Sequence, residues 1–280
     1  MPIKNKVKNK IHALKNLNWK WARKYYKKKL IMHLLFYFSL IKGKKNLEVD
    51  IDGTKCKLCF SHPYHHLFAR LLAENKHERT LLSLWKKQAV ESGDGVIFDI
   101  GAYNGIYGLI AGLVNPQAKV FIFEPDPINF QHIQNNIKLN NLANVVAVET
   151  AMSDRVGTIH FKRHPGATAG IIESDKNLSL NSKNDYSVQS TTINNWVAQN
   201  HRLPVLMKFD ISGAEYGALL AAKEILAQAE RMIIFLEFYP QQPEAELAFW
   251  SQLKELGYQW LYLYPREDGR STYYFVFKNL

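Results

Sequence analysis

The sequence is poor in two features that would point outside the cell or across a membrane. It has only two cysteines, Cys56 and Cys59, in 280 residues, which excludes a disulfide scaffold and is compatible with a reducing compartment. Its apolar stretch at residues 30–41 would form a helix of about 18 Å, too short for a hydrocarbon core of about 30 Å. Lysines follow that stretch where a signal peptide would have a cleavage site. We expect a cytoplasmic protein.

Acidic residues are absent from the first 45 positions, which hold 14 Lys and Arg. The rest of the chain has 22 basic and 25 acidic side chains, so the net charge of +11 belongs to an N-terminal arm, residues 1–45, which also contains interleaved Trp and Tyr. Two interpretations stay open: the arm packs as helices on the body, or it makes a peripheral contact with an anionic membrane at the inner face. Nucleic acid is a less favoured partner.

With 47% hydrophobic residues, the chain has enough apolar side chains for a large core. Residues 46–77 begin with alternating apolar positions on both sides of Asp52-Gly53, which predicts a β-hairpin followed by a connecting segment. The Cys56-x-x-Cys59 pair and the histidines after it suggest zinc. We do not favour a metal site, because the two cysteines fall on opposite faces of the strand and the ligand spacing is unusual.

Residues 78–280 form the expected main domain. Helical periodicity at 67–90 is followed by apolar strands that alternate with helices, which predicts an α/β protein with a mostly parallel, doubly wound sheet. A segment rich in Gly, Ser, Asn and Asp at 163–190 is expected to be a lid or binding loop, with disorder as the alternative. The expected strands are 96–100, 119–123, 145–149, 205–209, 232–238, 258–262 and 273–277.

The clearest motif is a Gly-rich turn after the first strand, Asp99-Ile-Gly101-Ala-Tyr-Asn-Gly105. Such a turn lets a ligand approach the backbone at the carboxyl edge of the sheet. An acidic residue at the strand end suits a cationic or amino-bearing ligand better than a phosphate. A structural turn without ligand is the alternative interpretation.

The second strand also ends in a carboxylate, Glu124, which can accept both hydroxyls of a ribose. The third strand ends near Ala151, where adenine would then lie. One nucleoside across three strand ends is the predicted ligand. The residues expected to contact it are Asp99, Gly101, Ala102, Tyr103, Asn104, Gly105, Glu124, Pro125, Asp126, Ala151, Met152 and Ser153.

Three further acids are expected at the same crevice. Asp210 ends the fourth strand on the same face as Lys208, Glu215 begins the next helix, and Glu237 lies at the end of the fifth strand. Each alone could be a solvated strand end or a helix N-terminal charge. Together they predict an acceptor site beside the nucleoside.

From residue 78 to residue 238 the sequence resembles the FkbM-type family of class I S-adenosylmethionine-dependent methyltransferases. The resemblance implies a Rossmann-like seven-stranded sheet with an antiparallel last strand, S-adenosylmethionine on the first two strand ends, and O-methylation of a hydroxyl. Ser212 stands where the family commonly has Glu, and Asn194 or Asn195 where it often has an acid. The motifs that carry the resemblance are those at 99–105, 123–126, 151–154, 191–193 and 208–215.

The predicted reaction is methylation of a hydroxyl on a sugar, a glycan or glycolipid precursor, or a natural product. Asp210 is expected to act as base or orienter, with Glu215 and Glu237 holding acceptor hydroxyls and His164 as a rival base. The three carboxylates permit Mg²⁺ without requiring it. An RNA or DNA methyltransferase tethered by the arm and a non-catalytic nucleoside-binding module are the alternatives.

Overall fold

The computed structural model describes residues 33–37, 39, 43, 45–60, 63–74, 78–162, 171–173, 185–211, 213–239, 243–265 and 272–279. Most of the basic arm therefore lies outside the described residues, and both interpretations of it stay predictions, as do the three segment boundaries. The arm's described end is helical at residues 33–37 and 39. Within the described ranges, no helix has the length and apolarity needed to cross a bilayer.

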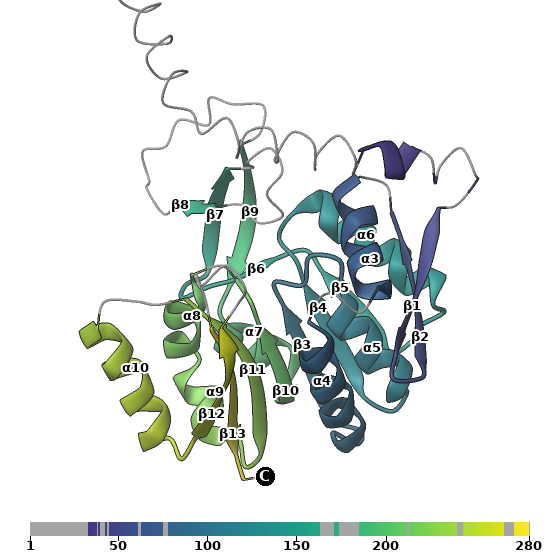
Figure 1. Cartoon of the computed structure of the whole chain (residues 1–280). Helices are drawn as coiled ribbons and strands as arrows, with labels where there is room; N and C mark the ends of the chain where they lie inside the picture. The colour runs from purple at the N-terminus through teal and green to yellow at the C-terminus, as the bar shows by residue number, and fades with distance from the viewer. Residues whose placement is uncertain are drawn as a thin grey trace, which may run out of the picture.

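The central feature is a seven-stranded sheet in the order β12-β13-β11-β10-β3-β4-β5. Strands β3, β4, β5, β10 and β11 are parallel, and β13 runs antiparallel to both of its neighbours. This confirms the expected α/β fold (Figure 1). The strands are β3 (Val96–Ile100), β4 (Lys119–Phe123), β5 (Val145–Val148), β10 (Pro204–Phe209), β11 (Met232–Phe238), β12 (Gln259–Pro265) and β13 (Thr272–Lys278).

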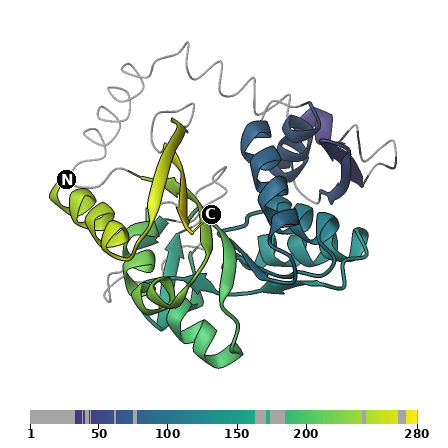
Figure 2. The ribbon, with the colours of Figure 1, turned by 90° about the horizontal axis from the view of Figure 1, so that it is seen from below.

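Helices cover both faces of this sheet because successive strand residues point to opposite sides, and both sides are apolar. In β3, Ile97 packs with one layer and Phe98 with the other. Figure 2 shows the hairpin at one end of the molecule and α10 at the other. The first layer contains α4 (Arg79–Glu91), α5 (Ile106–Val114) and α6 (Pro127–Leu139); the second contains α7 (Ile193–Asn200), α8 (Glu215–Ala221), α9 (Lys223–Gln228) and α10 (Pro243–Glu255).

An aromatic cluster anchors the second layer. The Trp196 ring of α7 lies 4.6–5.4 Å, centroid to centroid, from the rings of Phe98, Phe121 and Phe123. Edge-to-face aromatic contacts of this kind stabilise by about 0.5–1.5 kcal/mol each beyond the burial of area. The cluster fixes α7 across β3 and β4, directly beneath the strand ends that carry the predicted site.

The predicted hairpin is present as β1 (Asn46–Ile51) and β2 (Thr54–Cys59). Asp52 and Gly53 both have positive φ, 49° and 84°, as a tight two-residue turn requires. The amide oxygens of Asn136 on α6 and of Asn140, the C-cap of that helix, accept from the backbone N–H groups of Cys59 and Lys57, both at 2.8 Å. The hairpin is therefore docked on α6 through side-chain hydrogen bonds rather than added to the main sheet.

The helical stretch predicted at 67–90 is two helices, α3 (Pro63–Ala73) and α4. The break lies before α4, where Glu78 adopts a left-handed conformation at φ 45° and its backbone carbonyl accepts from the N–H of Leu82. Residues 74–80 include no apolar side chain and so interrupt the helical pattern, but they also include no Gly or Pro, which is why the sequence suggested one helix.

The expectation of a loop at 163–190 is partly wrong. Described residues of that segment form strands β8 (Ile171–Glu173) and β9 (Asp185–Thr191), which join β6 (Ala151–Met152) and β7 (Gly157–Lys162) in a second sheet ordered β6-β9-β7-β8. Its small core contains Ile159, Phe161 and Val188. Strand β8 has only three residues and β9 places Ser190 at an inward position, so their period-two signal is weak.

Candidate functional site

The candidate site lies at the carboxyl ends of β3, β4, β10 and β11. Strands β3 and β10 are neighbours, and the chain leaves them toward opposite faces of the sheet. The backbone N–H of Asp210 donates to the carbonyl of Ile100 at 3.1 Å, so the fourth-strand acid lies beside the first strand as the sequence predicts. Open α/β sheets bind ligands at such a switch point.

The Gly-rich turn is held against this point by close backbone packing. Gly101 has φ 76°, and a Cβ there would lie 1.8 Å from the carbonyl oxygen of Asp210. Only glycine fits both the left-handed conformation and this space. Ala102 donates its N–H to the carbonyl of Phe123 at 3.2 Å. The turn therefore joins the ends of three strands.

The rest of the turn starts helix α5. Tyr103 has φ 54°, and Gly105, with φ 79°, precedes the helix. The buried side-chain oxygen of Asn104 accepts from the N–H of Ile106 at 3.2 Å, and its carbonyl accepts from Asn136 at 3.0 Å. These bonds fix the turn without using a ligand.

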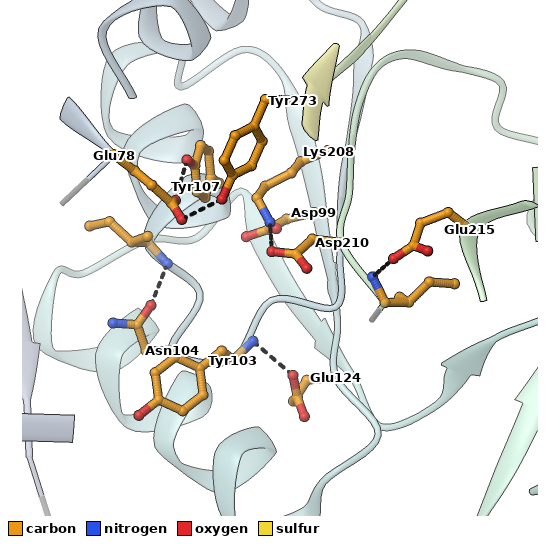
Figure 3. Close-up of polar contacts among 12 residues, drawn as sticks. Glu78, Asp99, Tyr103, Asn104, Tyr107, Glu124, Lys208, Asp210, Glu215 and Tyr273 are labelled. Carbon is orange, nitrogen blue, oxygen red and sulfur yellow. Dashed lines mark hydrogen bonds and ion pairs between the residues drawn. The ribbon is translucent and has the colours of Figure 1, made fainter. Parts of the chain in front are cut away.

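Glu124 is buried at the end of β4, and Figure 3 shows the N–H of Tyr103 donating to it. Its Oε2 accepts from the N–H of Tyr103 at 2.7 Å, and its Oε1 accepts from the N–H of Asp126 at 3.0 Å and from Nδ2 of Asn129 at 3.3 Å. Burial raises the pKa of Glu124 to about 7, although the three hydrogen bonds lower it. Because a carboxylate accepts about four hydrogen bonds, Oε2 keeps capacity for a ligand hydroxyl.

Other predicted nucleoside contacts lie around Glu124. Asp126 is the N-cap of α6 and accepts from two backbone N–H groups of the first turn, and the half-buried Pro125 precedes it. Ala151 and Met152 are buried in β6, and the N–H of Ser153 donates to the carbonyl of Thr191 at 2.9 Å. The third strand end therefore passes directly into the second sheet.

Asp99 is completely buried at the end of β3. Its Oδ2 accepts from the N–H of Gly108 at 2.8 Å, whereas its Oδ1 has no hydrogen-bond partner among the described residues. Burial raises the pKa of Asp99, and the charge of Lys208 opposes that shift. A buried acceptor atom of this kind costs free energy unless a donor reaches it.

Lys208 and Asp210 form a buried ion pair on one face of β10, with 2.9 Å between Nζ and Oδ2. Burial alone would lower the pKa of Lys208, but the surrounding carboxylates raise it. Burial and the neighbouring, hydrogen-bonded Glu237 raise the pKa of Asp210 above its usual range, although Lys208 opposes them. Side chains of Lys208 and Glu237 are nearly inaccessible, whereas 23% of the Asp210 side chain is exposed.

Sequence reasoning missed three members of this cluster. Glu78 accepts from the hydroxyl of Tyr107 at 2.6 Å through Oε2 and from the hydroxyl of Tyr273 at 2.9 Å through Oε1 (Figure 3). Nζ of Lys208 lies 4.8 Å from the centroid of the Tyr107 ring. The only signal for them was indirect: an acid just before a helix, and two tyrosines within apolar elements.

The cluster carries more acidic than basic groups. Lys208 is surrounded by the carboxyl groups of Glu78, Asp99, Asp210 and Glu237. Desolvated like charges repel, so bound protons or a cationic ligand would stabilise the cluster by reducing its excess negative charge. The site can therefore accept a positively charged group next to Asp99.

Glu215 lies apart from this cluster (Figure 3). It is buried, and its two oxygens accept from the backbone N–H groups of Ile211 and Gly213, both at 2.8 Å. Burial raises the pKa of Glu215 to about 7. Its carboxyl group therefore holds the loop after β10. His164, the rival base, and Ser212, which stands where the family commonly has Glu, lie outside the described residues.

Both cysteines are free thiols. Cys56 is buried, and Cys59 lies 3.5 Å from Nδ1 of His132. In the described part of the chain no three His, Cys, Asp or Glu residues are placed to hold a metal ion.

Known methyltransferases are similar to this chain. The sequence model described as "Methyltransferase FkbM domain" matches residues 99–260. The 2-O-methyltransferase NoeI of Sinorhizobium fredii is 28% identical over 180 residues, which are 60% of this chain and 70% of NoeI. The 31-O-demethyl-FK506 methyltransferase FkbM of Streptomyces tacrolimicus is 36% identical over 73 residues, 26% of this chain and 28% of that one. A crystal structure of methyltransferase FkbM from Methylobacillus flagellatus superposes with a TM-score of 0.47 at 15% identity, covering 74% of this chain and 54% of that one.

Proposed function

The chain belongs to the methyltransferase FkbM domain family, and from that premise we propose how its site methylates an acceptor. It is an S-adenosylmethionine-dependent methyltransferase that acts on a small-molecule acceptor. The proposed acceptor group is a hydroxyl of a sugar, of a glycan or glycolipid precursor, or of a natural product. Two similar proteins whose names specify methylation at oxygen, NoeI and FkbM, support this assignment.

The residues at the strand ends fit S-adenosylmethionine. Glu124 has acceptor capacity for the ribose, and Asp99 has a buried oxygen that lacks a donor among the described residues. The acidic excess around Lys208 suits a ligand that carries an ammonium and a sulfonium. When bound, the cofactor supplies an electrophilic methyl carbon on a sulfonium leaving group.

One observation carries the assignment of the base: among the three predicted catalytic acids, Asp210 alone has a side chain that is more than marginally exposed at the switch point. We propose that its carboxylate takes the proton of the acceptor hydroxyl, since its raised pKa makes it a better base near neutral pH. Glu237, which is buried and hydrogen-bonded to Asp210, and Lys208, which is paired with it, would orient Asp210.

We propose a role for Glu215 that differs from the one expected from the sequence, which was to hold an acceptor hydroxyl. Both of its oxygens are occupied by the backbone of the loop after β10, so it would position that loop rather than bind an acceptor hydroxyl. We propose Mg²⁺-independent chemistry, because Asp210 is already paired with Lys208 and Glu215 with backbone donors.

The finer assignments of partner and location are also proposals. A cytoplasmic enzyme whose basic residues 1–45 contact an anionic membrane would meet glycolipid precursors there. Co-sedimentation of the full chain with anionic vesicles at low and high salt tests this contact. Loss of binding at high salt supports it, and equal sedimentation with neutral vesicles contradicts it.

Calorimetric titration with S-adenosylhomocysteine is the first test of the site. The native chain should bind, and a variant carrying both Asp99→Ala and Glu124→Ala should not, while Glu230→Gln, an exposed carboxylate at the opposite end of the sheet, should bind normally. Absence of binding by folded native chain would overturn the proposal.

Transfer of a labelled methyl group into cell fractions then tests the acceptor. An alkali-stable methyl ether in a glycan, glycolipid or natural-product fraction supports the proposed reaction. Label in RNA or DNA would favour the nucleic-acid alternative, and cofactor binding without transfer to any fraction would favour the non-catalytic module.

A further inference from the structure

We infer that His65, which lies before the family-matched residues, is a positioning residue for the cofactor's ribose. It acts by holding Asn129 in the orientation that donates to Glu124. The inference rests on the proposed role of Glu124 as ribose ligand. The match to the family begins at residue 99 and so assigns nothing to His65.

His65 lies on α3 and is 5% exposed. Its Nε2 lies 3.2 Å from Oδ1 of Asn129, on the first turn of α6, and Nδ2 of the same amide lies 3.3 Å from Oε1 of Glu124. Asn129 is itself buried, at 6% exposed. Three elements, α3, α6 and β4, are therefore joined by one buried amide.

The direction of these bonds follows from what each group can donate. An amide oxygen only accepts and an amide nitrogen only donates. If the Asn129 amide were reversed, its oxygen would face the carboxylate of Glu124, which also accepts from Tyr103 and Asp126. Nε2 of His65 must therefore carry the proton that it shares with Oδ1.

The ring of His65 is held in place by stacking. It lies 3.8 Å, centroid to centroid, from the ring of His132 at an interplanar angle of 27°, and 5.5 Å from the ring of Tyr103. Burial and the neighbouring His65 lower the pKa of His132 to about 3, so the stacked ring is neutral. His132 in turn contacts the thiol of Cys59 on β2.

The hairpin and α3 thus support the ribose end of the site from outside the main sheet. Without the donor on His65, the Asn129 amide is free to rotate and present its oxygen to Glu124. Glu124 would lose one of its three donors, and its remaining oxygen would be oriented less well for ribose hydroxyls.

A matched set of variants tests this. His65→Phe keeps the ring and removes the donor, and His65→Gln keeps a donor near the Nε2 position. His66→Phe is the control, since His66 is equally buried on the same helix but bonds to Ser39 instead. We expect His65→Phe to weaken S-adenosylhomocysteine binding about fivefold, the effect of one ordinary hydrogen bond, and His65→Gln and His66→Phe to bind within about twofold of the native chain.

Two further readouts separate positioning from general destabilisation. An analogue that lacks both ribose hydroxyls should bind native and His65→Phe chains alike, because Glu124 has nothing to hold in it. In a double-mutant cycle with Asn129→Ala, the loss caused by His65→Phe should largely disappear. If His65→Phe does not fold, His65→Asn, whose amide is too short to reach Asn129, replaces it in the comparison with His65→Gln.

The outcomes are distinct. Native chain that fails to bind S-adenosylhomocysteine contradicts the proposed function itself. Native chain that binds while His65→Phe binds equally well overturns this inference alone. Equal weakening for the analogue and the full ligand would also overturn it, by showing that His65 supports the fold rather than the ribose site.

Discussion

Two carboxyl groups of the candidate site, the buried Glu124 and the partly exposed Asp210, are held in opposite ways. Glu124 accepts hydrogen bonds from two backbone N–H groups and one amide, all uncharged donors fixed by the surrounding fold. Asp210 is held by one cation, Lys208, in a cluster with three further carboxyl groups. The first arrangement suits the proposed binding role of Glu124, whereas the second, with its raised pKa, suits the proposed role of Asp210 as a base.

The largest expected effect is on turnover. Asp210→Asn keeps the shape of the side chain but removes the base, so methyl transfer should fall by about 10²–10⁴-fold. Affinity for S-adenosylhomocysteine, measured by calorimetry, should change by less than about threefold. Equal losses of affinity and turnover would mean that Asp210, like Glu124, serves binding, and would contradict the proposed difference between the two residues.

Gly101→Ala tests the close packing of the Gly-rich turn against the backbone of Asp210. The new Cβ would overlap the carbonyl oxygen of Asp210 in a left-handed residue, so the free energy of unfolding should fall by about 3 kcal/mol in urea titrations. Gly53→Ala is the control: its φ of 84° is similar, and nothing lies within 4 Å of the added carbon. It should cost only about 1 kcal/mol. Equal costs would show that crowding at Asp210 is unimportant.

Glu124→Gln tests the proposed role of Glu124 in binding the cofactor. The change replaces one acceptor oxygen by a donor that faces other donors, and affinity for S-adenosylhomocysteine should fall by about 10–100-fold. Turnover at saturating cofactor should be nearly unchanged, as measured by methyl release from labelled donor. A large loss of turnover at saturation would contradict the assignment of Glu124 to binding.

The pH dependence of stability tests the buried acids directly. The pKa values of Glu124 and Glu215 are raised to about 7 in the folded chain, so between their usual value of 4.5 and 7 the folded state holds protons that the unfolded state has released. The free energy of unfolding of the cofactor-free chain should therefore fall as pH rises through this window.

Urea titrations at pH 5 and pH 8 measure that slope. Glu215→Gln should remove about 1–2 kcal/mol of the difference, because residue 215 then no longer titrates. A slope that is unchanged in Glu215→Gln would contradict the burial of an ionisable group there.

Much of the fold could be predicted from the sequence. Strands buried on both faces are continuous apolar runs, so the positions of β3, β4 and β11 were predicted correctly to the residue. The grouping of the acids at the ends of β3, β4 and β10 could be predicted as well, because the carboxyl ends of parallel strands share one edge of a sheet. The Asp52-Gly53 turn could also be predicted, because its conformation depends on those two neighbouring residues.

Other features depended on contacts that no local pattern encodes. Strands β8 and β9 of the second sheet lie in the segment 163–190 that was expected to be a loop, because β8 has only three residues and β9 places Ser190 at an inward position. Glu215 was expected to face the acceptor, but the loop after β10 turns its N–H groups toward that carboxyl group.

The sequence by itself determined the order of the main strands and which ends carry acids, because hydrophobic period and turn chemistry are properties of neighbouring residues. Tertiary structure alone decided which distant groups meet: Glu78 with Tyr273, 195 positions away, and His65 with Asn129, 64 positions away. Such pairs arise from the docking of helices and the pairing of distant strands. Those depend on the packing of the whole chain, and a side chain's final partner is fixed only when that packing is complete.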